Sequence, residues 1–148
     1  MKLVPLVLAT GAAAILASTA TAAAASAPSC SLASTSRVKS ALGIAVGSPS
    51  VTKNGPVTVC LFASAHPLLV RFETDETASL FTAGRKSFGQ HGEPTKTVNG
   101  LGTQAYSSSI GSTSNTIVVL KNTTELLITS NEPLAKVVAL AKLILPSL

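Results

Sequence analysis

The chain has 148 residues, of which 46% are hydrophobic and only 11% are charged, and its formal net charge at pH 7 is +5. The basic residues are scattered, with only Arg85 and Lys86 adjacent, and the chain has no Trp and a single Tyr. A nucleic-acid surface needs clustered positive charge, usually with stacking aromatic side chains, so the composition excludes that class of function.

The first 27 residues have the pattern of a secretory signal peptide. Lys2 precedes an apolar run from Leu3 to about Ala17, which gives way to Ala, Ser and Thr with several A-x-A cleavage sites. We expect cleavage after Ala27, which leaves residues 28–148 as a single secreted domain of 148 − 27 = 121 residues. The alternative is an uncleaved N-terminal membrane anchor, because this segment is long enough to span a bilayer. Ala, Ser and Thr favour insertion weakly and no basic cluster follows, so cleavage is the prediction.

The two cysteines, Cys30 and Cys60, are predicted to form a disulfide. A lipid-modified Cys30 would follow a short motif with Leu that ends in Ala or Gly, whereas Ala27-Pro28-Ser29 precede it here. A reactive thiol would need a basic or helix-N-terminal setting. Cys30 does precede a predicted helix, but Cys60 provides a partner. A secretory context with two cysteines favours a structural bridge.

The first half of the predicted domain combines a helix with a β-hairpin. Residues 35–42 are predicted to form a short helix that ends at Gly43. Residues 44–56 are rich in turn residues and hold a short strand or none. Residues 57–65 are β-branched and apolar and predict a strand, which His66-Pro67 break before a second strand over 68–73.

The second half adds two helices and three strands. A helix is predicted from a cap at Thr74 or Asp75 to Gly89, with Arg85 and Lys86 in its last turn. Strands follow over 103–109, 116–121 and 125–130, the last two as a tight hairpin. An apolar helix over 133–145 is too short to span a membrane and is expected to pack on the sheet. The fold class is therefore α+β, with an antiparallel sheet of about five strands and two to three helices packed on one face.

The order of these features resembles a group of small secreted or lipid-anchored actinobacterial domains. The matching stretches are "CSLASTSRVKSALG", "VCLF", "VNGLGTQAYSSS" and "VVLKNTTELLITS", with a closing apolar helix, and they cover roughly residues 30–145. The resemblance implies a cell-envelope or extracellular domain without established chemistry. It carries over Cys30, Cys60, Gly100, Gly102 and Tyr106 as scaffold positions. Members of the group often have Trp after the second Cys, where this chain has Leu61-Phe62, and many are lipoproteins, whereas this chain lacks the lipid signal.

The ionisable residues do not follow a catalytic or metal-binding pattern. His91 and Glu93 are close in sequence but lack a third ligand, and His66 falls at a predicted hairpin turn. Glu73, Asp75 and Glu76 are explained as a strand end and a helix start. The carboxylates available for paired acid/base chemistry are these three together with Glu93, Glu125 and Glu132. We therefore expect a protein that is not an enzyme, with no catalytic, metal-binding or cofactor-binding residues.

The predicted function is a secreted, disulfide-linked binding module at the cell envelope or outside the cell. Its partner would be an envelope or extracellular protein, a polymer or an apolar ligand, with no nucleic acid and no stable membrane insertion after signal cleavage. The Ser-rich stretch 105–109 and the loop 110–115 could present hydrogen-bonding groups, or simply form a solvated sheet edge. The alternatives are an inhibitor of a secreted enzyme and a small hydrolase that depends on His66 or His91.

Overall fold

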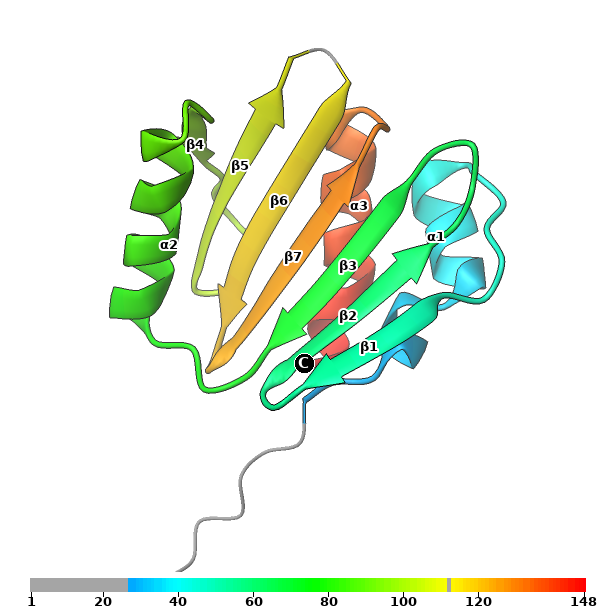
Figure 1. Ribbon diagram of the computed structural model, residues 1–148, viewed down its shortest axis with the longest axis horizontal. Coiled ribbons are helices and arrows are strands. Elements are labelled where there is room, and N and C mark those ends of the chain that lie inside the picture. The colour runs from blue at the N-terminus through cyan, green and yellow to red at the C-terminus, as the bar shows by residue number, and fades with distance from the viewer. Residues whose placement is uncertain (1–26, 112) are drawn as a thin grey trace, which may run out of the picture.

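The computed structural model describes residues 27–111 and 113–148 as a seven-stranded antiparallel sheet with three α-helices (Figure 1). The expected signal peptide, residues 1–27, lies outside the described residues except for Ala27. The strand order is β1-β2-β3-β7-β6-β5-β4. The elements in chain order are η1 (Cys30–Ala33), α1 (Thr35–Leu42), β1 (Ser50–Asn54), β2 (Val57–Phe62), β3 (Leu68–Glu73), α2 (Ala78–Gln90), β4 (Thr95–Thr97), β5 (Gln104–Ile110), β6 (Ser114–Lys121), β7 (Thr124–Ser130), α3 (Leu134–Ile144) and η2 (Leu145–Ser147). The predicted α+β class is confirmed.

The prediction of about five strands was too low, because β1 and β4 form the two edges of the sheet. All five residues of β1 are exposed, and β4 has only three residues. Neither segment carries the alternation of apolar and polar residues that identifies a half-buried strand in a sequence. Both exist because the backbone of the neighbouring strand offers hydrogen bonds, as the pairs Val51–Cys60 and Lys96–Ser107 show.

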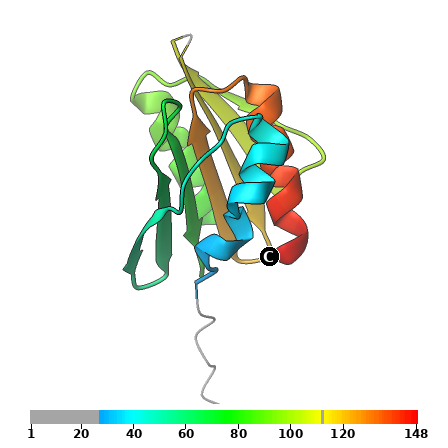
Figure 2. The same cartoon turned by 90° about the vertical axis from the view of Figure 1, so that its right-hand side faces the viewer.

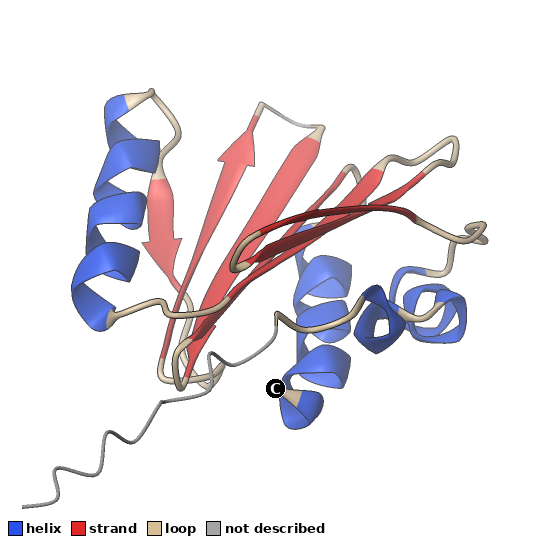
Figure 3. Cartoon of the chain, turned by 60° about the horizontal axis from the view of Figure 1, so that its bottom comes forward, coloured by secondary structure: helices blue, strands red, loops and turns tan. Residues whose placement is uncertain are grey.

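The prediction that the helices pack on one face was also wrong. Helices α1 and α3 cover one face of the sheet, and α2 covers part of the other (Figures 2 and 3). The alternation along β5 and β6 shows this division: Ala105 and Val119 belong to the core beneath α1 and α3, whereas Tyr106 and Val118 pack with Phe81 of α2. Successive residues of a strand point to opposite faces, so the sheet has a separate apolar cluster on each side.

The helix ends follow from local capping. The Ser34 side chain accepts a hydrogen bond from the Arg37 amide, and Gly43 ends α1 with φ +76°, as predicted. Helix α2 begins later than predicted, because Thr77 is the residue whose side chain accepts from the Leu80 amide. Asp75 and Glu76 therefore precede the helix and do not lie in its first turn. Arg85 and Lys86 lie before its last turn.

Helix α3 supplies the largest apolar face to the core. Val137, Leu140, Ala141 and Ile144 are fully buried against the sheet and against α1. Removing such side chains from water is the main stabilising contribution available to a domain of this size. Within residues 27–111 and 113–148, no helix has the length and apolar character needed to cross a membrane.

Candidate functional site

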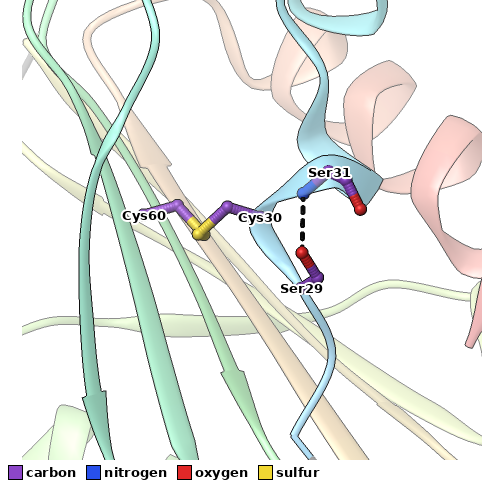
Figure 4. Close-up of a disulfide and its surroundings, with 4 residues drawn as sticks. All are labelled: Ser29, Cys30, Ser31 and Cys60. Atoms are coloured by element: carbon purple, nitrogen blue, oxygen red, sulfur yellow. Dashed lines mark hydrogen bonds between the residues drawn. A yellow bond between two sulfur atoms is a disulfide. The ribbon is translucent and has the colours of Figure 1, made fainter.

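The predicted disulfide between Cys30 and Cys60 is present (Figure 4). Cys30 opens the 3-10 helix η1, Cys60 lies in β2, and their α-carbons are 5.7 Å apart. Ser29 accepts a hydrogen bond from the Ser31 amide at the start of η1. Both cysteines are buried, and because their sulfurs are bonded to each other neither is a free thiol. The bridge joins the N-terminal end of the described chain to the sheet.

The two histidines contact different residues. His66, at the β2–β3 turn, places Nδ1 3.1 Å from Glu132 Oε1, and Lys136 Nζ lies 2.9 Å from the other oxygen of that carboxylate. His91, at the end of α2, places Nδ1 2.7 Å from the Ser87 carbonyl oxygen. Among the described residues, no group of three or more His, Cys, Asp or Glu side chains could hold a metal ion.

One half of the second sheet face is not covered by a helix. Helix α2 lies beside β4 and packs Phe81 against Tyr106 of β5 and Val118 of β6. In Figure 1, no helix lies in front of β7, β3, β2 and β1. The side chains on this half alternate with core residues in β2, β3 and β7. We call this set the uncovered face: Val57, Val59, Leu61, Leu69, Arg71, Glu73, Glu125, Leu127 and Thr129.

The uncovered face is more apolar than a sheet surface that only meets water. Solvated faces of antiparallel sheets usually carry polar residues at alternate positions. Here five of the nine side chains are Val or Leu, and Leu61 is 49% exposed. Leu127 packs against the cluster beneath α2, so the apolar strip begins at that helix and continues outward to β2. Such a strip is a surface that a partner can cover.

A charged cluster lies at one end of the uncovered face. Arg71 of β3 bonds the Glu125 carboxylate of β7, and its Nη2 lies 3.3 Å from Glu73 Oε2. Glu76, in the β3–α2 connection, is buried near these groups, and its amide donates to the Thr123 carbonyl oxygen at 3.0 Å. Three carboxylates and one guanidinium give a formal charge of −3 + 1 = −2 in this part of a basic protein.

Burial is the main cause of the raised carboxyl pKa values in this cluster. It raises the pKa of the Glu76 carboxyl, and the negative charges of Glu125 and Glu73 raise it further. Burial also raises the pKa of Glu125, although the charge and hydrogen bond of Arg71 oppose that shift. The pKa of the Tyr106 hydroxyl is raised well above its ordinary value, first by burial and then by Glu125.

Tyr106 and Gly102 have structural roles in the fold. The Tyr106 ring is 1% exposed and makes edge contacts with Phe81 and Phe88 of α2, at centroid distances of 5.2 and 5.7 Å. Gly102 has φ +54°, and a Cβ at this position would clash with the Leu120 carbonyl oxygen. This close approach allows the Thr103 amide to donate to the same oxygen at 2.7 Å.

The Ser-rich stretch is not the exposed surface or sheet edge that its composition predicts. Strand β5 lies inside the sheet between β6 and β4, so Ser107 and Ser108 are only 4% and 3% exposed. Ser108 Oγ donates to the Pro94 carbonyl oxygen at 3.2 Å. These small hydroxyls allow β4 to pack beside β5.

The apolar composition of the uncovered face and the partners of Arg71 were not predicted from the sequence. A usable indication was present, because "VTVCLF" is apolar at both alternating positions and therefore predicts two buried or partner-covered faces. The pairing of Arg71 with Glu125 requires β3 to lie beside β7, which the chain order does not indicate. Comparison of the chain with models of protein families, with curated proteins and with solved structures finds no match.

Proposed function

We propose that this protein is a secreted, disulfide-linked, non-enzymatic binding module that engages a partner at the cell envelope or outside the cell. The observation that carries the proposal is the uncovered face, where partly exposed Val and Leu side chains continue from the cluster beneath α2. A buried disulfide supports an oxidising compartment, because such bonds persist mainly outside the reducing cytosol. The partner is an envelope or extracellular protein or polymer.

The likeness to the actinobacterial secreted domains is part of the same proposal. It rests on the spacing of Cys30, Cys60 and the glycine turn before Tyr106. In such a domain these residues would maintain the scaffold, and the uncovered face would bind the partner. The binding proposal does not depend on this relationship.

The binding proposal can be tested with two matched variants. Leu61 points to the uncovered face, whereas Val51, on the neighbouring strand, points to the other side, and their exposed fractions are 49% and 51%. Both Leu61→Glu and Val51→Glu place one charge at an equally exposed site, so neither should change stability by more than about 0.5 kcal/mol. Purified wild-type and variant proteins are sedimented with envelope fragments and, separately, passed over immobilised secreted proteins. Leu61→Glu should lose binding and Val51→Glu should keep it; equal binding by both contradicts the proposal.

The hydrolase alternative has one supporting contact, the pair of His66 with Glu132. A carboxylate bonded to one ring nitrogen orients a catalytic imidazole in many hydrolases. The described residues bring no nucleophilic hydroxyl into hydrogen-bond contact with the ring of His66. A panel of chromogenic esters and glycosides separates the two functions. We expect no turnover; turnover that His66→Gln abolishes and His91→Gln retains would establish the hydrolase.

A further inference from the structure

A second surface feature, away from the uncovered face, is a hollow between α2 and the turn that joins β4 to β5. Its volume is about 210 Å³. Phe81 and Arg85 of α2 form one side, and residues 97–105 form the other. This size suits a molecule smaller than a typical drug-sized ligand, whose pockets measure roughly 300–1,000 Å³.

The turn of residues 99–102, which contains Gly100 and Gly102, forms a fixed wall of the hollow. Gly102 packs against the Leu120 backbone of β6, and the hydrogen bond from the Thr103 amide to the Leu120 carbonyl oxygen fixes the turn to the sheet. Gly100 has φ +78°, and a Cβ built there meets no atom within 4 Å, so its backbone borders open space. A glycine in this position lets a ligand approach the main chain closely.

Arg85 supplies the charged group. Its Nε donates to Thr95 Oγ1 at 3.1 Å, and its guanidinium carbon lies 5.7 Å from the centre of the Tyr106 ring. These two contacts orient the guanidinium, while its terminal nitrogens have no hydrogen-bond partner among the described residues. The other two arginines differ: Arg37 donates to the Leu32 carbonyl oxygen, and Arg71 binds two carboxylates.

We infer that this hollow binds a small carboxylate ligand, with Arg85 as its anchor. A guanidinium with free terminal nitrogens matches the two oxygens of a carboxylate. Phe81 and Leu101 line the hollow as almost fully buried apolar side chains, and Asn99 and Gln104 offer hydrogen-bonding groups at the rim. The carboxylate can come from a free small acid or from the C-terminus of a peptide.

The test is an NMR titration of the isotope-labelled protein with N-acetyl-alanine and, as a control, N-acetyl-alaninamide, which lacks the carboxylate. We expect the acid to shift the Gly100 and Thr103 amide resonances and the Arg85 Nε resonance saturably, and the amide to leave them unchanged. A tetrapeptide that ends in alanine distinguishes the two sources: tighter binding than N-acetyl-alanine assigns the site to a peptide terminus, and equal binding assigns it to a free acid. Binding of acid and amide with equal affinity, or no saturable shift with the acid or the peptide, would overturn the inference.

Two variants and one control test the role of the anchor. Arg85→Gln should weaken binding of N-acetyl-alanine about tenfold or more, because a charge-assisted hydrogen bond is lost. Lys86→Gln removes the same charge one residue further along α2 from an exposed side chain that does not line the hollow, and should change affinity by less than about twofold. Asn99→Asp adds a negative charge at an exposed lining position, so it should weaken binding even if Arg85→Gln disturbs folding. Unchanged affinity in Asn99→Asp and in a folded Arg85→Gln would overturn the assignment.

Discussion

Arg71 of β3 bonds Glu125 of β7 across two strands that are 54 residues apart in the sequence, on the part of the sheet that α2 leaves uncovered. The Glu125 side chain is 7% exposed, so its charge depends on this partner. The bond therefore holds the uncovered face together at the junction between the N-terminal and C-terminal halves of the sheet.

Arg71→Met should lower the free energy of unfolding by about 2 kcal/mol. Breaking a fully buried pair costs roughly 3–5 kcal/mol, and the part of Arg71 that reaches solvent reduces that loss. Lys53→Met, at an exposed position of the edge strand β1, is the control and should change stability by less than about 0.5 kcal/mol. Urea unfolding measures both. Adding Glu125→Gln to Arg71→Met should restore part of the loss, and a further loss in the double variant would contradict the pairing.

Glu76 should make the protein less stable as the pH rises above about 4.5. Its carboxyl pKa is higher in the folded protein than in the unfolded chain, mainly because of burial, so the folded state binds more protons between the two values. The contribution of this carboxyl to stability is fully present below the unfolded pKa and is lost as the pH rises through the folded one. Glu76→Gln should reduce this decline and be more stable than wild type at pH 7. A variant that is less stable than wild type at pH 7 would show that the ionised carboxylate is stabilising instead.

Removal of the disulfide should cost roughly 3 to 4 kcal/mol. The bridge closes a sequence separation of 30 residues, and the estimate follows from the conformational freedom that it removes from the unfolded chain. The double variant Cys30→Ser/Cys60→Ser should unfold at lower urea concentration than wild type. Reductant should lower the wild-type midpoint to that of the variant and leave the variant unchanged. Equal midpoints of oxidised wild type and variant would contradict a stabilising role.

The intact mass of the secreted protein tests the expected processing. A chain of residues 28–148 should be found in the culture medium, and alkylation should modify two thiols only after reduction. A mass that includes residues 1–27, an added lipid, or two thiols that are free before reduction would assign the protein to the membrane or the cytoplasm and remove the basis for a released module.

The sequence predicts the elements whose patterns are local. Strands β2, β3, β6 and β7 and the ends of α1 follow from apolar runs, turn residues and caps. The edge strand β4 was missed, and the sequence allows a short strand or none at β1, because neither exposed strand has an apolar pattern. The side of the sheet on which α2 packs could not be predicted, because the stripe with Phe81 and Phe88 fits either face of a sheet whose strands are apolar on both sides.

The candidate surfaces depend on contacts between distant segments. The disulfide was predictable because the chain has only two cysteines. The cluster of Arg71, Glu76 and Glu125 was not predictable, because α2 and three strands separate β3 from its neighbour β7 in the chain. The hollow beside Arg85 likewise arises from the packing of α2 on the β4–β5 turn.

The most direct test of the binding module is hydroxyl-radical footprinting of the partner-bound protein. Leu61 and Val51 have nearly equal exposure on opposite sides of neighbouring strands, so each is an internal reference for the other. When the protein is bound to envelope fragments or to a captured secreted protein, we predict that oxidation of Leu61 falls several-fold and oxidation of Val51 is unchanged. Unchanged oxidation of Leu61 in the bound protein, or protection of Val51 instead, would contradict binding through the uncovered face.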